Sequence, residues 1–428
     1  MKRIIVFMIP CFILFSSIHS SGQRAWRPFS DDSPWNQKIP ADAKTDPNSA
    51  QLIDSLAAAP FYINIDEWSI PVYYVNSDLV PKVNVINSRP GIYGRGFKEP
   101  NQIPVLPNFI ASPPVGENSD NHICIVDTAK MIEWDMWAAR KNNDGNWTTG
   151  LGAVTDMRST GVEKPWYAQE HEFDAHRSRA GGFPLSAGLI RPEEIKAGKI
   201  EHALVFAYQR GLSEFFIPPA STAQATFMEM NNRFGIPMGG RIQLDPSINV
   251  DTLNLTPACK IIARALQQYG AFNGDYAGAT VLYADNSPQA LKEWKRILGA
   301  EDLTKVFNTE FVRKYFRVIE MGKLLPGQNL STGQYGFLEF SVPEMKLVKI
   351  DWLNTKIEVV VDGSENISKL KPEFKTVKKN AVVTVNHVQQ QSGRTSVNFR
   401  TPVEYTVSVP GACKVIWIVT VVKTYIKE

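Results

Sequence analysis

The sequence predicts a mainly β protein with some α-helix: a β-sandwich-like N-terminal domain with packed helices, followed by a small immunoglobulin-like β-sandwich. Short β-branched and aromatic runs alternate with turn residues between 61 and 160, which is the pattern of half-buried strands. Seven more strand-like runs follow residue 336. The chain also carries 10 Trp, 13 Tyr and 28 Pro, and exposed aromatic faces suit flat, uncharged ligands such as sugars.

The N-terminus predicts export. Lys2 and Arg3 precede an almost wholly apolar run over 4–17, and small polar residues then continue to about Gln23. This is the pattern of a signal peptide over 1–23, and it is too short for a membrane span. We therefore expect a protein of the periplasm, the cell surface or the medium, with no membrane span in the mature chain.

The mature chain is longer than one hydrophobic core usually serves, so we expect two domains. A β-rich first domain is predicted over 24–321; its carbohydrate activity is implied by a resemblance given below. The stretch GKLLPGQNLSTGQYG over 322–336 reads as a linker, because it is rich in Pro, Gly and Ser. The small β-sandwich then occupies 337–428, with the strand-like runs FLEFSV, LVKIDWL, KIEVVV, NAVVTVNHV, SVNFR, EYTVSV and KVIWIVTVV.

Charge and cysteine content exclude several classes of protein. The formal net charge is +3, or +1 without Lys2 and Arg3, and no basic run suggests nucleic acid. The mature cysteines, Cys124, Cys259 and Cys413, are scattered and include no C-x-x-C pair. We expect a monomer without a cofactor.

Three helices stand out in the N-terminal domain. One spans Ser49 to Ala58. Another follows Thr256 as cap and Pro257 in the first turn, and a third is capped by Ser287. Apolar residues at helical spacing share one face of the second of these: Ile261, Ile262, Ala265, Leu266 and Tyr269.

Candidate chemistry begins with a hairpin from His122 to Arg140, turned at DTAK. On its second strand Glu133, Asp135 and Trp137 alternate and so share one face at steps of ~6.6 Å. Paired carboxyls beside a Trp suit glycoside cleavage, which needs one protonated and one ionised acid. A solvated sheet face is the more ordinary interpretation for Glu133, so we favour Asp135.

Asp156 ends the next strand, GLGAVTD, where it either faces Asp135 or caps a turn. The predicted acid pair is Asp135 and Asp156. His122, at the start of its strand, and His202 are further catalytic candidates, although a buried histidine is usually a hydrogen-bonded core residue. Arg191 is a candidate for binding substrate, whereas the Glu193 and Glu194 that follow Pro192 read as the start of a helix.

The stretch EHEFDAHRSRAGGFP over 170–184 gathers two histidines, three carboxylates and two arginines. His171, Asp174 and His176 have the types of side chain that ligate Ca²⁺ or Zn²⁺, but they lack the spacing of a tight site, so we expect no metal there beyond a weak structural cation. We interpret the loop as a lip of a substrate cleft that hinges at Gly181-Gly182, with His176 or Arg179 touching the ligand. Trp137 and Trp147 are the candidate stacking platforms.

Two resemblances add to this reading. The C-terminal 90 residues, with IEVVV, SKLKPEF, AVVTV, QQSGRTSVNFRTPVEYTVSV and KVIWIVTVV, resemble immunoglobulin-like modules of Bacteroidetes glycan-binding and glycan-degrading proteins. Residues 31–320 resemble a large family of secreted bacterial proteins common in soil actinobacteria. The matching pieces are SPWNQKIPADAKTDPNSAQLIDSL, DNHICIVD, DMWAAR, NWTTGLGAVTDM, AGGFPLSAGLIRPEEIKAGKIEHALVFA, IPMGGRIQLDP and IARALQQYGA.

The second resemblance implies an exported, β-rich, carbohydrate-active protein. It places an acid before the Trp at Asp135 and matches Arg191 and His202, whereas residues 163–178 are an insertion relative to the family. The sequence thus predicts a secreted glycoside hydrolase acting on a polysaccharide or oligosaccharide. A lyase of uronic-acid glycans, with His122 as base and Arg191 neutralising the carboxylate, is the alternative enzyme. A non-catalytic glycan-binding surface protein is the alternative from another class.

Overall fold

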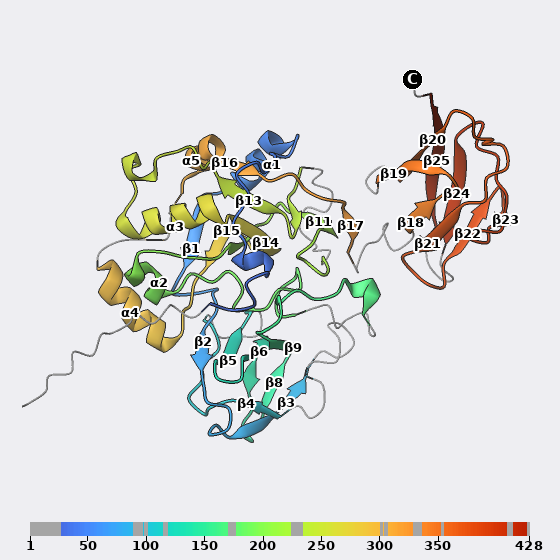
Figure 1. The fold of residues 1–428 in the computed structure, drawn as a ribbon. Helices are drawn as coiled ribbons and strands as arrows, with labels where there is room; N and C mark the ends of the chain where they lie inside the picture. The colour runs from blue at the N-terminus through green and yellow to red at the C-terminus, as the bar shows by residue number, and fades with distance from the viewer. Residues whose placement is uncertain are drawn as a thin grey trace, which may run out of the picture.

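The computed structural model describes residues 27–88, 97, 102–113, 119–169, 177–223, 234–299, 303, 307–327, 336–351, 355–408 and 414–425. These residues form several β-sheets and a few helices, so the predicted mainly β class with β-sandwich-like parts is confirmed (Figure 1). The expected signal peptide over 1–23 lies outside the described residues. Among the described residues no helix is both long enough and apolar enough to cross a membrane.

A mixed six-stranded sheet organises the larger part of the chain. Its order is β1-β15-β10-β14-β13-β16, in which β1 pairs with β15 and β10 with β14 in parallel. The strands are β1 (Phe61–Asn64), β15 (Thr280–Tyr283), β10 (Leu204–Ala207), β14 (Ala271–Asp275), β13 (Arg241–Leu244) and β16 (Phe316–Val318). A small sheet of order β12-β11-β17 has the strands β12 (Pro237–Met238), β11 (Leu212–Phe216) and β17 (Leu325–Pro326).

Five helices cover one face of the six-stranded sheet: α1 (Ser49–Leu56), α2 (Pro192–Ala197), α3 (Pro257–Gln268), α4 (Pro288–Leu298) and α5 (Thr309–Tyr315). Each contributes buried side chains to one core cluster with Phe61, Leu204 and Phe206 of the sheet. The predicted caps are confirmed, because Thr256 accepts from Cys259 N and Ser287 from Ala290 N. Val205 and Val281 point to the opposite face of the sheet and belong to a separate hydrophobic cluster. The five helices therefore do not cover that face.

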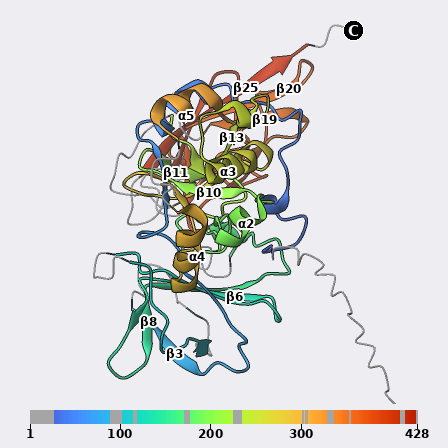
Figure 2. The same ribbon diagram turned by 90° about the vertical axis from the view of Figure 1, so that its left-hand side faces the viewer.

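Two four-stranded sheets pack below this layer in the views of Figure 1 and Figure 2. One is ordered β2-β5-β6-β9 and the other β4-β3-β8-β7. The strands are β2 (Val72–Tyr74), β5 (Ile123–Asp127), β6 (Ile132–Trp137), β9 (Leu151–Asp156), β4 (Gln102–Pro104), β3 (Lys82–Asn87), β8 (Trp147–Thr149) and β7 (Arg140–Lys141). Their shared core holds Val85, Ile123, Ile125, Met136 and Trp147. The predicted hairpin is confirmed as the antiparallel pair β5–β6, with Cys124 opposite Asp135.

The C-terminal part is a small β-sandwich. A two-stranded sheet, β18-β21, faces a six-stranded sheet of order β19-β20-β25-β24-β22-β23. The strands are β18 (Phe337–Ser341), β19 (Met345–Asp351), β20 (Lys356–Asp362), β21 (Glu373–Thr376), β22 (Val382–Val385), β23 (Val388–Gln389), β24 (Val403–Ser408) and β25 (Lys414–Thr424). Phe337 joins the two sheets, with its ring 5.8 Å from those of both Tyr405 and Trp417.

Two local expectations differ from the structure. SVNFR over 396–400 is not a strand and makes only the isolated bridge between Val397 and Leu370, whereas β21 takes its place in the smaller sheet. Residues 325–326 of the expected linker form β17 instead. This short strand pairs antiparallel with β11, with Phe215 opposite Pro326 and Phe216 opposite Leu325. Residues 328–335 of that linker lie outside the described residues.

Candidate functional site

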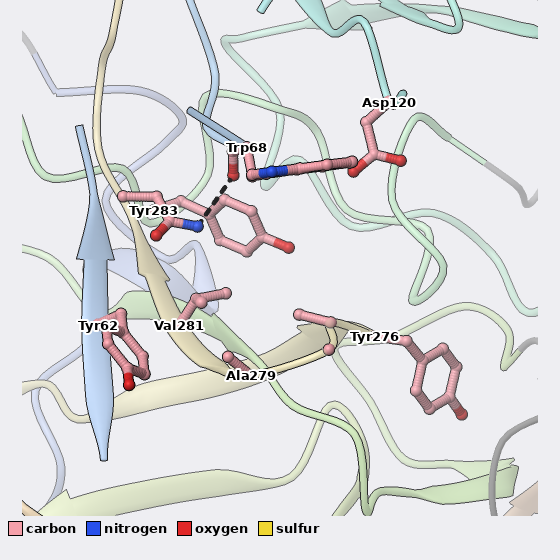
Figure 3. Close-up of a pocket in the computed structure, with 10 residues that line it drawn as sticks. Tyr62, Trp68, Asp120, Tyr276, Ala279, Val281 and Tyr283 are labelled. Carbon is pink, nitrogen blue, oxygen red and sulfur yellow. Dashed lines mark hydrogen bonds between the residues drawn. The ribbon is translucent and has the colours of Figure 1, made fainter. Parts of the chain in front are cut away.

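A pocket of about 560 Å³ lies on the face of the six-stranded sheet that the helices leave free (Figure 3). Four aromatic side chains and one carboxylate dominate its walls. The lining residues are Tyr62, Asn64, Trp68, Asp120, Tyr276, Ala277, Gly278, Ala279, Val281 and Tyr283. Mostly aromatic and apolar walls with few polar groups are typical of small-molecule sites.

The parallel pair β1–β15 explains one wall. Tyr62 lies opposite Val281 and Asn64 opposite Tyr283 in the register. Alternate residues of a strand point to the same face, so all four side chains face the pocket. The turn after β14 supplies Tyr276 to Ala279, which closes the floor (Figure 3).

Trp68 forms an exposed aromatic wall. Its side chain is 42% exposed, which is unusual for so large a ring. Its backbone has φ of 55° and is held by two hydrogen bonds, from Trp68 N to Pro113 O (2.8 Å) and from Asn64 Nδ2 to Trp68 O (3.4 Å). In Figure 3 the indole lies between Tyr283 and Asp120. A sugar ring could stack on such a surface.

A buried cation stands behind the pocket wall. Cζ of Arg179 lies 4.1 Å from the centroid of the Tyr283 ring, and Nη2 donates to Leu185 O at 3.2 Å. Nε and Nη1 of Arg179 have no hydrogen-bond partner among the described residues. On the same side Asp120 Oδ1 accepts from Trp137 Nε1 at 3.1 Å. The structure therefore brings two predicted substrate-binding residues, Trp137 and Arg179, beside the pocket.

Asp275 supplies a second carboxyl next to the pocket, immediately before Tyr276. Burial raises the pKa of Asp275 to about 7. The charge of Arg179 and the backbone N–H groups of Tyr276 and Ala180 lower it, whereas the charge of Asp120 raises it further. A carboxyl with this pKa exchanges a proton near neutral pH, which is what general acid catalysis requires.

His122 is buried beside these groups. Its Nε2 donates to the carbonyl oxygen of Ser178 at 3.1 Å, because a carbonyl can only accept. Burial lowers the pKa of His122, the charge of Asp120 raises it, and that of Arg179 lowers it. A neutral imidazole that donates from Nε2 keeps Nδ1 as an acceptor.

Asp135 does not reach the pocket lining. Both Asp135 and Glu133 are fully buried, and Leu185 and Ser186 cover them. Leu185 N donates to Asp135 Oδ2 (2.9 Å) and Ser186 N to Glu133 Oε1 (3.0 Å). The shared face of β6 is as expected, but the solvated interpretation of Glu133 is wrong, because a distant loop closes over that face.

Asp156 cannot pair with Asp135. It lies opposite Ile132 in the β6–β9 register, whereas Asp135 lies opposite Ala153, so the two side chains point to opposite faces. The Asp156 side chain is 51% exposed and pairs with Arg158 Nε at 2.8 Å. The alternative, a carboxylate at the turn that ends the strand, is the one that the structure supports.

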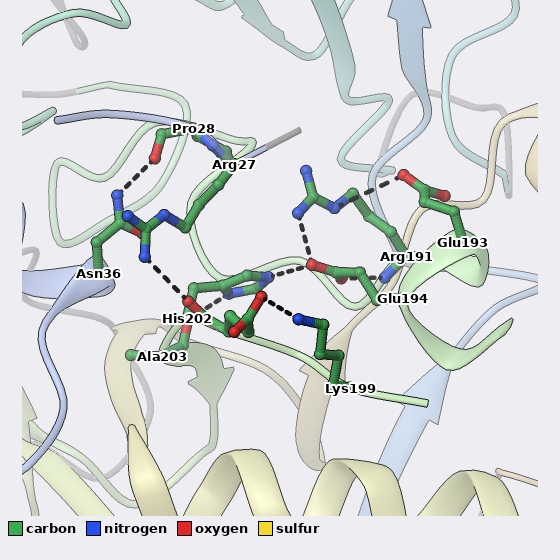
Figure 4. Close-up of polar contacts among 10 residues, drawn as sticks. Arg27, Pro28, Asn36, Arg191, Glu193, Glu194, Lys199, His202 and Ala203 are labelled. Atoms are coloured by element: carbon green, nitrogen blue, oxygen red, sulfur yellow. Dashed lines mark hydrogen bonds and ion pairs between the residues drawn. The ribbon is translucent and has the colours of Figure 1, made fainter. Parts of the chain in front are cut away.

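Arg191 and His202 meet around Glu194 (Figure 4). Glu194 Oε1 accepts from Arg191 Nη2 (2.6 Å) and from His202 Nε2 (2.9 Å), and Oε2 accepts from Arg191 N (3.1 Å). His202 Nδ1 donates to Ala203 O (2.9 Å). Burial raises the pKa of Glu194, but the charges of Arg191 and His202 outweigh it and bring the pKa to about 2. This cluster holds α2 in place and lies outside the pocket lining.

Trp147 and the stretch over 170–184 hold the remaining predicted site residues. Trp147 is buried in the core between the two four-stranded sheets, so it offers no stacking platform. His171, Asp174 and His176 lie outside the described residues. Gly181 and Gly182 are buried rather than hinge-like. Gly181 N donates to Gly274 O (2.9 Å), and a Cβ at Gly181 would lie 3.0 Å from that oxygen, so the glycine permits close packing of two backbones.

The sequence did not predict the lining residues Tyr62, Trp68, Asp120 and Tyr276, nor Asp275, which precedes Tyr276. They come from three segments distant in the chain. The polar run before His122, GENSDN, contains Asp120 and is the one local signal that pointed to this region.

Comparison with known proteins gives one family match. Residues 337–421 match the family described as SGBP, N-terminal, a glycan-binding family of Bacteroidetes type. The predicted kind of C-terminal module is thereby supported. The match covers the C-terminal module alone. No curated protein matches the chain.

Two solved structures are similar over small parts of the chain. One is a candidate glycoside hydrolase from Bacteroides thetaiotaomicron, with 24% identity, 23% of this chain and 28% of that chain covered, and a TM-score of 0.19. The other is a candidate secreted protein from Bacteroides fragilis, with 12% identity, 22% of this chain and all of that chain covered, and a TM-score of 0.19.

Proposed function

We propose that the protein is an exported glycoside hydrolase that binds a saccharide in the aromatic pocket and cleaves it with Asp275 and Asp120. The observation that carries this proposal is the position of Asp275, a carboxyl with a pKa of about 7, directly beside a pocket walled by Tyr62, Trp68 and Tyr276. The acid pair predicted from the sequence, Asp135 and Asp156, is replaced by this one.

The chemistry of glycoside cleavage fits these groups. Asp275 can hold a proton at neutral pH and give it to the departing glycosidic oxygen. Asp120, on the opposite side of Trp68 from Tyr283 in Figure 3, supplies the carboxylate that stabilises positive charge on the sugar or activates water. The aromatic faces position the ring, which lowers the entropic cost of reaching the transition state.

The charges beside the pocket favour hydrolysis over a lyase reaction. A lyase must neutralise a sugar carboxylate before a base removes the neighbouring proton. Arg191, the expected neutralising residue, is committed to Glu194 at 2.6 Å. Arg179 stacks on the ring of Tyr283 and is not a lining residue of the pocket, so it is poorly placed to pair with a sugar carboxylate there. The two acidic groups, Asp120 and Asp275, would stabilise the positive charge of a glycosidase transition state and would repel an anionic sugar.

A non-catalytic glycan-binding role is the second candidate, and the match of residues 337–421 to a glycan-binding family favours it. In that case the same pocket binds a saccharide, and Trp68 and Tyr276 supply the affinity. In either proposal the C-terminal module acts as a spacer or an adhesive platform. The protein works outside the cytoplasm, and it does so as a monomer.

One experiment separates the two roles. The mature protein is incubated with plant, algal and bacterial polysaccharides, and released reducing ends and unsaturated products are measured. We expect new reducing ends without unsaturated uronic acids, and we expect Asp275→Asn to lower turnover about 10²–10⁴-fold while glycan binding is retained. Binding without product, abolished by Trp68→Ala and unaffected by Asp275→Asn, would identify a binding protein instead.

A further inference from the structure

We propose that Cys124, Glu133 and Asp135 form a buried site for one divalent cation of the zinc type. These side chains are fully buried, and each offers one ligand atom within 4.8 Å of the others. They lie outside the pocket lining, so the inference stands independently of the proposed function.

The β5–β6 hairpin places the three side chains together. Cys124 lies directly opposite Asp135, and Glu133 lies two residues before Asp135 on the same face of β6. The side chains of Ile123 and Ile125 point the other way, into the core between the two four-stranded sheets. The thiol and the two carboxyls therefore face the segment that carries Leu185 and Ser186.

The spacing suits a tetrahedral metal ion. Sγ of Cys124 lies 3.6 Å from Oε1 of Glu133. Zinc bonds of about 2.3 Å to sulfur and about 2.0–2.2 Å to oxygen put two such ligands about 3.5 Å apart in tetrahedral geometry. The backbone needs little movement to bring these two atoms to one ion.

Asp135 supplies the independent sign of a ligand. Its Oδ1 is buried and has no hydrogen-bond partner among the described residues, whereas its Oδ2 accepts from Leu185 N at 2.9 Å. Both oxygens of Glu133 are already engaged: Oε1 accepts from Ser186 N at 3.0 Å and from the Cys124 thiol, and Oε2 accepts from the Ser186 hydroxyl. A carboxylate that is oriented by an outer hydrogen bond and keeps its other oxygen free, as Asp135 does, is characteristic of a metal ligand.

The positive charge of Arg177 acts on Asp135, but among the described residues no hydrogen bond joins the two side chains. Its two Nη atoms donate to Thr155 and Glu163, and its Nε has no hydrogen-bond partner in the part of the chain that the structure describes. Two adjacent buried carboxylates cannot both stay ionised without a counter-charge. A divalent cation supplies it, and a thiolate ligand favours zinc over Mg²⁺ or Ca²⁺.

Such an ion would tie the hairpin to the segment over 185–186. The sequence predicts no metal, and this inference departs from that expectation. It also gives Cys124 a role that a buried aliphatic side chain would not fill.

The test uses the mature full chain with zinc alone as the probe. After exposure to zinc and desalting, we expect about one zinc per chain by elemental analysis and a higher Tm than after chelation. Cys124→Ser and Asp135→Asn should each lose the bound zinc, whereas Asp156→Asn, a carboxyl on the exposed face, should keep it. With Co²⁺ the wild type should show thiolate-to-metal absorption that Cys124→Ser lacks, which serves as the readout where Asp135→Asn fails to fold.

A protein that binds neither zinc nor cobalt would contradict the proposed site. If the wild type retains no zinc or cobalt, and chelation leaves its Tm unchanged, the proposal is overturned. An Asp135→Asn variant that is then as stable as the wild type, or more so, would show that the two carboxyls share a proton.

Discussion

The guanidinium of Arg179 stacks on the ring of Tyr283, 4.1 Å from its centroid, and so places a buried positive charge directly behind the pocket wall. This contact couples the segment after residue 176 to β15. The same charge lowers the pKa of Asp275, so the proton affinity of the proposed acid depends on a residue that does not line the pocket.

Arg179→Gln should therefore raise the pKa of Asp275 above about 7. If Asp275 is the general acid, kcat/KM falls as Asp275 loses its proton, and this alkaline limb should move to higher pH in the variant. The measurement is the pH dependence of kcat/KM on a cleaved glycan. Arg158→Gln, which removes an exposed arginine paired with Asp156, is the control and should leave the profile in place. An unmoved limb in Arg179→Gln would contradict the coupling.

Asp275 should also make the free energy of unfolding depend on pH. Its pKa in the folded protein is raised to about 7, against about 3.9 in the unfolded chain, so the folded state binds the extra proton. Its contribution to stability is then fully present below about pH 4 and is lost as pH rises through about 7. Asp275→Asn removes this loss, and we expect a gain of about 1–3 kcal/mol at pH 8 that is absent at pH 4. Chemical denaturation at both pH values measures it, and an equal change at both would contradict the assignment.

Trp68→Ala should weaken saccharide binding without unfolding the protein. The ring is 42% exposed, so its removal opens no core cavity. Loss of one stacking face should cost on the order of 1.4 kcal/mol, or roughly tenfold in Kd. Titration calorimetry with a bound oligosaccharide measures it. Leu79→Ala, at a side chain that is 79% exposed and outside the pocket lining, is the matched control, and equal losses in both variants would count against the pocket.

The sequence predicted well where the determinants are local. The hairpin after His122, the caps at Thr256 and Ser287, and the mainly β class depend on residues close together in the chain, and the structure confirms them. β21 was missed because Glu373 and Lys375 are exposed on a short edge strand and leave no apolar alternation.

The pocket could not be predicted in the same way. Tyr62 and Tyr283 become neighbours only through the parallel pairing of β1 with β15, across a long separation in sequence. The face of Asp135 was predicted correctly, but nothing local shows that Leu185 and Ser186 cover it. Whether a carboxyl on a sheet face is a catalytic group or a buried anchor depends on that distant cover.

Glu194 should be the most sensitive of the acidic residues to substitution. Glu194→Gln removes the buried carboxylate that both Arg191 and His202 contact and leaves Arg191 only the longer ion pair to Glu193, so we expect a loss of about 3–5 kcal/mol in the free energy of unfolding. The neighbouring Glu193→Gln changes a side chain that is 52% exposed and 3.8 Å from Arg191 Nε, so it should cost less than about 1 kcal/mol. Because the pKa of Glu194 is about 2 in the folded state, this contribution should also be lost as pH falls from about 4.5 towards 2. Comparable losses in the two variants would show that the ion cluster is not what stabilises α2.

Asp120 and Asp156 provide the decisive comparison of the two acid pairs. Asp120 lines the pocket and accepts from Trp137 Nε1 at 3.1 Å, whereas Asp156 is 51% exposed and engaged by Arg158. Asp120→Asn keeps an oxygen that can accept from the indole, so the fold should survive, but the charge that stabilises the transition state is gone. We expect kcat to fall at least about 10²-fold in Asp120→Asn and to stay within about twofold of wild type in Asp156→Asn. Circular dichroism confirms folding of both, and the rate of release of reducing ends gives the comparison. Loss of turnover in Asp156→Asn with full activity in Asp120→Asn would move the chemistry from the pocket to the outer face of β9.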